Sequence, residues 1–149
     1  GSILTRATGQ VINPNMELLF KGPQLRTFGL TWKMSPRDYE ESEMIKKIIR
    51  EFKQSMAVQR SESQLFLKSP NTYKLQYLTG NRDHSFLPKI KECALTGCNI
   101  NYTPDGNYAT YENSSMVAYE MTLNFNELEP IYHDDYTKLD GNTDQSIGF

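Results

Sequence analysis

The stretch 31–57, TWKMSPRDYEESEMIKKIIREFKQSMA, joins a strand pattern to a helix pattern with almost no chain between them. In its strand part, and just before it, apolar side chains alternate with Thr, Gly and Lys at Phe28, Leu30, Trp32 and Met34. A period of two predicts a half-buried strand with one apolar face. Phe28, Leu30 and Trp32 are therefore expected in the core, and for Trp32 we favour this over a role as a ligand platform.

The second part of the stretch predicts a helix over about 36–57. Ser35 is placed to cap the free N–H groups, Pro36 suits the first helical position and Asp38 completes a capping box. Apolar residues at helical spacing predict a buried face, which contains the expected core residues Ile45, Ile48, Ile49 and Phe52. The charged face is either simply solvated or a contact surface for a neighbouring subunit or an outer protein, and its candidate contact residues are Glu43, Lys46, Lys47, Arg50 and Lys53.

Most of the remaining chain has strand patterns. Short strands are predicted at 16–20, 64–68 and 72–78, and a long one at 88–103. The alternation in the long strand changes phase near Thr96-Gly97, which indicates a β-bulge. The turn that follows is predicted at 104–107, which has the sequence PDGN.

The clearest strand pattern covers 116–128. Its apolar face predicts five further core residues, which are Val117, Tyr119, Met121, Leu123 and Phe125. The opposite face is short and mostly uncharged, and it carries Glu120, Thr122, Asn124 and Asn126. Such a face is common on antiparallel sheets, and it would also suit the wall of a channel through which a polymer slides.

Composition limits the classes of function. The chain has 149 residues, enough for one domain, and a formal net charge of -2 from 16 basic and 18 acidic residues. This balance argues against a protein that grips the nucleic-acid backbone. No apolar run predicts a membrane helix or a signal peptide. Cys93 and Cys98 have the spacing of neither a zinc site nor a disulfide framework, which fits a reducing cytosol.

No pattern of a catalytic, metal-binding or cofactor-binding site stands out. The alternative of an enzyme would use His133 with Asp134 and Asp135 as a base or a metal site. A single histidine in a tail-like setting speaks against it, so we expect no enzyme and no cofactor.

The chain divides into three parts. Residues 1–12 are expected to be a scar of tag removal, Gly1-Ser2, followed by an N-terminal arm or linker. Residues 13–135 form the predicted β domain with its helix. Residues 136–149 are expected to be a polar C-terminal tail with little packing.

Short motifs in a fixed order carry a resemblance to a known family. The motifs are NPNMELLFKG (13–22), RTF (26–28), MSPR (34–37), EE (40–41), IIREFK (48–53), CALT (93–96), NYTPDGNY (101–108) and MTLNFNEL (121–128). Over about 13–135 the chain resembles the tube-forming domain of contractile-tail bacteriophage proteins. Within that group it is most similar to the baseplate tail-tube junction and tail-tube cap proteins of T-even-like phages.

The resemblance implies a mainly β fold with one flanking helix, either a two-sheet sandwich or a distorted antiparallel barrel. It implies a structural protein of the virion that is assembled in the bacterial host cytoplasm, six copies of which form a ring between the baseplate hub and the tail tube. The implied partners are the tail-tube protein, other junction and hub proteins and the tape-measure protein. DNA would pass through the lumen without specific binding.

Under this resemblance the polar strand face, Glu120 to Asn126, is the candidate lumen surface. The fragment itself is expected to be monomeric in solution, because stacking on neighbouring rings would supply contacts that it lacks alone. The alternatives are a ring protein of a secretion tube and a small binding module.

Overall fold

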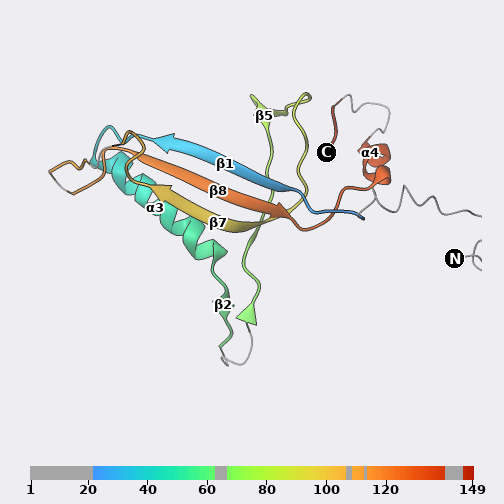
Figure 1. The fold of residues 1–149 in the computed structure, drawn as a ribbon, viewed down its shortest axis with the longest axis horizontal. Helices are drawn as coiled ribbons and strands as arrows, with labels where there is room; N and C mark the ends of the chain where they lie inside the picture. Colours follow the sequence, from blue (N-terminus) through green and yellow to red (C-terminus); the bar gives the residue numbers. More distant parts are fainter. Residues whose placement is uncertain (1–21, 63–66, 107–108, 113, 140–145) are drawn as a thin grey trace, which may run out of the picture.

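The computed structural model describes residues 22–62, 67–106, 109–112, 114–139 and 146–149. Its centre is a curled antiparallel sheet of four strands, half of a barrel, with one long helix on one face (Figure 1). The predicted fold class, mainly β with a flanking helix, is confirmed, and the sheet is open rather than closed. The expected arm at 1–12, the strand at 16–20 and most of the strand at 64–68 lie outside the described residues.

The sheet has the strand order β1-β8-β7-β4. Its strands are β1 (Thr27–Met34), β8 (Tyr119–Glu127), β7 (Cys93–Asn101) and β4 (Thr72–Tyr73). Two small two-stranded ribbons extend from it, formed by β2 (Gln59–Arg60) with β3 (Leu67–Lys68) and by β5 (Leu78–Thr79) with β6 (Arg82–Asp83). The predicted strand at 72–78 is therefore present only as two short pieces, β4 and the start of β5.

The central strands are in the register that the alternation of the sequence demands. Trp32 of β1 lies opposite Met121 of β8, and Ile100 of β7 lies opposite the same Met121, so apolar residues share one face. The pairing of β7 with β8 shifts between Leu95 and Gly97. This irregularity confirms the predicted bulge, which places the apolar residues on both sides of it on the same face.

The long helix α3 covers Tyr39–Met56, and its start differs from the prediction. The N-cap is Asp38 and not Ser35: the Asp38 carboxylate accepts a hydrogen bond from Glu41 N–H at 2.8 Å. Pro36 therefore precedes the helix. The Glu41 carboxylate in turn accepts from the Arg37 backbone N–H at 2.7 Å, so acidic side chains satisfy amides on both sides of the cap. These two hydrogen bonds explain why the helix begins three residues later than predicted.

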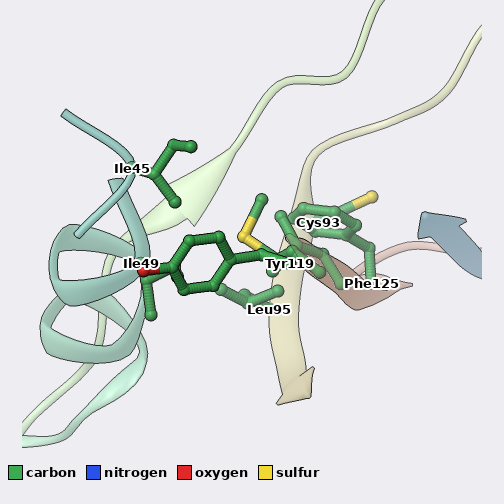
Figure 2. Packing of buried hydrophobic residues seen from close by; sticks show 8 residues of the cluster. Ile45, Ile49, Cys93, Leu95, Tyr119 and Phe125 are labelled. Carbon is green, nitrogen blue, oxygen red and sulfur yellow. The ribbon is translucent and has the colours of Figure 1, made fainter. Parts of the chain in front are cut away.

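The core lies between α3 and the sheet (Figure 2). Its buried residues are Ile45, Ile49, Cys93, Leu95, Tyr119, Met121, Leu123 and Phe125. Among the other predicted core residues, Leu30, Ile48 and Phe52 are partly buried and pack against this cluster. Phe28 and Val117 are half-buried and lie outside it. At one end Tyr73 joins the helix to the sheet, since its ring stacks on Phe52 and meets Phe125 edge-on.

The prediction that Trp32 lies in the core is wrong, because Trp32 is 43% exposed. It lies on the apolar face, but on the edge strand β1, whereas α3 packs chiefly against β7. An apolar cavity of about 260 Å³ therefore opens beside it, lined also by Leu30, Phe52 and Tyr73. Strand alternation predicts which face a residue occupies, but it does not predict how far a helix extends over that face.

The end of the sequence also differs from the predicted tail. Residues His133–Leu139 form the short helix α4, and residues 146–149 lie against the chain that follows β6 (Figure 1). Lys89 N–H donates to the Gly148 carbonyl at 2.7 Å, and Gly148 is buried. The expectation of little packing is therefore wrong for 146–149. None of the described helices is both long and apolar enough to cross a membrane.

Candidate functional site: the polar face of the sheet

The face of the sheet opposite α3 is built from small and polar side chains on three strands. In β8 these are Glu120, Thr122, Asn124 and Asn126, and all four are half-buried. The strand register adds their neighbours on the same face, which are Thr27, Gly29, Thr31 and Lys33 of β1 and Ala94, Gly97, Asn99 and Asn101 of β7. We call these positions the polar face.

Asn124 lies at the centre of the polar face, between two glycines on the flanking strands. A Cβ at Gly97 would lie 3.0 Å from Asn124 Nδ2, and one at Gly29 would lie 3.4 Å from Asn124 Oδ1. The Asn124 amide thus occupies the space that a side chain at Gly29 or Gly97 would need. The two glycines keep this part of the face flat.

Two cross-strand hydrogen bonds and one local hydrogen bond lie at the polar face. Thr31 and Thr122 share a hydrogen bond between their hydroxyl oxygens at 3.1 Å. At the bulge, the Thr96 hydroxyl donates to the Asn124 carbonyl at 3.1 Å. Asn101 Oδ1 accepts from the Thr103 N–H at 2.9 Å at the far end of β7. The Thr31, Thr122 and Asn101 side chains are thus already paired within the chain.

Among the positions of the polar face the charged ones lie at one end, whereas Glu92, which accepts from the Thr72 hydroxyl of β4 opposite Ala94, places a carboxylate beside the other end. The charged members of the face, Lys33 and Glu120, are cross-strand partners, and Lys33 also pairs with Asp105 in the turn after β7. The rest of the face carries Thr, Asn, Gly and Ala. Without an excess of positive charge, the face has no means of holding a phosphate backbone tightly.

The structure thus brings the four candidate residues of β8 together on one open face. The residues of β7 on this face were not predicted. The bulge itself was predicted, but Thr96 shifts every following side chain by one position, and the side chains after it were not assigned to a face. Reading the residues after Gly97 in the shifted phase would have placed Asn99 and Asn101 on the polar face.

Most of the candidate contact residues of α3 are exposed. Lys46, Lys47, Arg50 and Lys53 are exposed, and Glu43 is half-buried. Lys46 Nζ lies 2.7 Å from Glu43 Oε1. This hydrogen bond lowers the pKa of Glu43 and raises the pKa of Lys46. The surface therefore carries charges of both signs, and two of them, Lys46 and Glu43, form an ion pair with each other.

Among the residues of the enzyme alternative, Asp135 has hydrogen-bond partners in other parts of the chain. Asp135 Oδ2 accepts from Lys91 Nζ at 2.7 Å and from Tyr132 N–H at 2.8 Å. Within the described parts of the chain, no three His, Cys, Asp or Glu side chains are grouped as metal ligands. Burial raises the pKa of both Cys93 and Cys98, which disfavours the reactive thiolate.

Comparison of the chain with protein-family models and with curated protein sequences gave no match.

Proposed function

We propose that this domain is a structural assembly protein of a contractile phage tail. In this proposal six copies form a ring that joins the baseplate hub to the tail tube and initiates tube polymerisation. The polar face lines the lumen, through which DNA and the tape-measure protein pass. The partners are the tail-tube protein and the other junction and hub proteins, and the site of action is the virion baseplate.

The observation that carries the proposal is the pairing of a nearly uncharged polar face with an open, curled sheet. A wall of Thr, Asn and Gly offers a moving polyanion neither strong attraction nor strong repulsion. The curl matches a segment of a wider barrel, and a barrel needs several copies to close.

Strand direction also supports a ring. All neighbours in the order β1-β8-β7-β4 are antiparallel, so β1 and β4 at the two edges run in opposite directions. Rotation about an axis keeps the direction of each strand, so β4 of one copy would meet β1 of the next as an antiparallel pair. Such closure would remove the exposed edge of β1, along which no strand pairs in the described chain.

The exposed apolar surface beside Trp32 fits the same proposal. An edge strand with an uncovered Trp and a cavity of about 260 Å³ is a liability for an isolated domain. In a ring, the neighbouring copy that pairs with β1 would also cover Trp32.

The proposal is tested by adding charge to the polar face. Glu120→Lys combined with Asn124→Lys is expected to fold, which circular dichroism checks, because both residues are half-buried on the face opposite α3. It should reduce the number of tubes initiated from purified tail-tube subunits, counted by electron microscopy. The matched control is Glu40→Lys with Gln54→Lys on the exposed side of α3, which changes the net charge equally. Equal tube counts for the two double variants would contradict the assignment of the lumen.

A small binding module is the second candidate, and the cavity beside Trp32 is the observation that favours it. An apolar ligand in this cavity would change the fluorescence of Trp32, the single Trp of the chain. This candidate predicts saturable quenching by a small apolar probe. Its failure would leave the tube proposal unaffected.

A further inference from the structure

Residues 146–149 occupy a built site next to the β5–β6 ribbon. Ile147 N–H donates to the Ser85 carbonyl at 2.9 Å, and Lys89 N–H donates to the Gly148 carbonyl at 2.7 Å. The Tyr136 hydroxyl donates to the Phe149 carbonyl at 3.0 Å. Two main-chain bonds and one side-chain bond thus hold residues 147–149 in place.

The Phe149 side chain makes aromatic and cation–π contacts in this site. Its ring lies edge-on to the Tyr136 ring, with the centroids 6.4 Å apart, and Lys91 Nζ lies 5.6 Å from its centroid. Phe149 also borders a cavity of about 150 Å³, whose apolar lining includes Leu75, Tyr77, Leu87 and Ile90. Gly148 is buried between these contacts and has φ of 81°, a conformation that favours glycine.

Lys91, which faces the Phe149 ring, is held in place by other parts of the chain. Lys91 Nζ donates to Asp135 Oδ2 at 2.7 Å and to the Pro130 carbonyl at 3.0 Å, and it lies 5.9 Å from the Tyr132 ring centroid. Its side chain is only 14% exposed. None of these contacts involves 146–149, so the ammonium group that faces Phe149 is positioned without the segment.

We propose that this site is a docking groove for an Ile-Gly-Phe segment, filled here by the chain's own residues 147–149 and able to accept the same segment from a second copy. The contacts are chemically identical in the two cases, which is the condition under which identical elements exchange between copies. The chain's own segment competes at high effective concentration, so the groove becomes available when that segment is displaced. This inference stands apart from the tube proposal, because it depends on neither the polar face nor a ring.

A peptide-binding experiment tests the groove. The probe is the peptide DQSIGF (144–149), with a fluorescein at its N-terminus and an amide at its C-terminus. Gly148→Val in the full chain should displace the chain's own segment, because a β-branched residue is strained at positive φ. The peptide should then bind this variant at least tenfold more tightly than the wild type, as measured by fluorescence anisotropy. Adding Lys91→Gln should weaken binding, and a peptide with Ala in place of Phe should not bind.

Absence of saturable binding to the Gly148→Val chain, or equal binding of the Ala peptide, would overturn the groove. If circular dichroism shows that Gly148→Val prevents folding, Phe149→Ala in the full chain replaces it with the same expected result.

Exchange between copies needs its own measurement. Chains with Ser85→Cys and chains with Ile147→Cys are mixed under mild oxidation, since the backbones of these residues are hydrogen-bonded in one copy. A covalent dimer of unlike chains is expected in clear excess over a mixture in which Glu40→Cys replaces Ser85→Cys. Peptide binding without this excess would overturn the second copy as the occupant.

Discussion

Arg26 and Glu127 form a two-pronged ion pair at the start of β1 and the end of β8. Arg26 Nε lies 2.6 Å from Glu127 Oε1, and the second guanidinium nitrogen lies 3.1 Å from Oε2. The Glu127 side chain is fully buried and also accepts the Lys91 N–H at 2.7 Å. The same guanidinium donates to the Lys89 carbonyl at 3.0 Å and lies over the Phe28 ring. The pair raises the pKa of Arg26 and joins β1, β8 and the segment before β7.

Removal of the arginine should therefore be costly. Arg26→Met leaves the buried Glu127 carboxylate without its charged partner, and we expect the free energy of unfolding to fall by about 3 kcal/mol, as measured by urea denaturation. Glu127→Gln on the Arg26→Met background should recover part of the loss. Arg37→Met, which breaks an exposed pair with Glu41, is the control and should leave the midpoint unchanged. Equal midpoints for Arg26→Met and Arg37→Met would show that the buried pair does not stabilise the sheet.

The packing of α3 on the sheet predicts that substitutions on its buried and exposed sides differ in their effect on stability. Ile49 is 8% exposed and Met44, on the same helix, is 58% exposed. Ile49→Ala should lower the free energy of unfolding by about 2–4 kcal/mol through lost burial and a residual cavity. Met44→Ala should change it little, since Ala has the higher helix propensity. Similar losses for both variants would mean that α3 is not packed by this face.

The close approach of Asn124 to Gly97 is tested by a double-mutant cycle. Gly97→Val introduces a Cβ 3.0 Å from Asn124 Nδ2 and should destabilise the fold by about 1–3 kcal/mol. Asn124→Ala should reduce this cost when combined with Gly97→Val, because it removes the atoms that clash. Additive effects in the thermal midpoints would place the strain elsewhere. Gly29→Ala, where the contact is 3.4 Å, serves as the milder comparison.

Lys91 gives a prediction for alkaline pH. Its hydrogen bond to Asp135 raises its pKa above the ordinary value of 10.5. A lysine pKa that is raised by folding stabilises the native state below the unfolded pKa, and this stabilisation is lost as the pH rises through the folded pKa. The difference in thermal midpoint between the wild type and Lys91→Met should therefore be constant from pH 7 to about pH 10 and shrink at higher pH. A difference that persists unchanged above this range would show that the Lys91 charge is not the stabilising group.

Those parts of the fold that depend on neighbours in the sequence were predictable. The alternation in β1 and β8, the apolar stripe of α3 and the phase change at Gly97 are local patterns, and each agrees with the structure. Arg26 and Glu127 are 101 residues apart, so no local pattern indicates their pairing. Glu127 instead continues the apolar face of β8 as a charge, and this break in the pattern was the available signal.

In the candidate site, too, local features were predictable and long-range ones were not. The polar side chains of β8 were predicted, because a single strand determines which of them share a face. The contribution of β7 was missed because it depends on how β7 pairs with β8 after the bulge. The exposure of Trp32 was missed because it depends on where α3 lies. The packing of 146–149 against Lys91 and Tyr136 could not be predicted, because these residues are far from one another in the sequence.

Electron microscopy of this chain mixed with purified tail-tube subunits is the sharpest test of the tube proposal. Six-fold rings are expected at tube ends, with the sheet on the inside, the polar face of β1, β8 and β7 toward the central channel, and α3 on the outside. By sedimentation the chain alone should remain monomeric at micromolar concentration. Rings with the polar face directed outward, or tubes that form equally well without this chain and never carry it, would contradict the account.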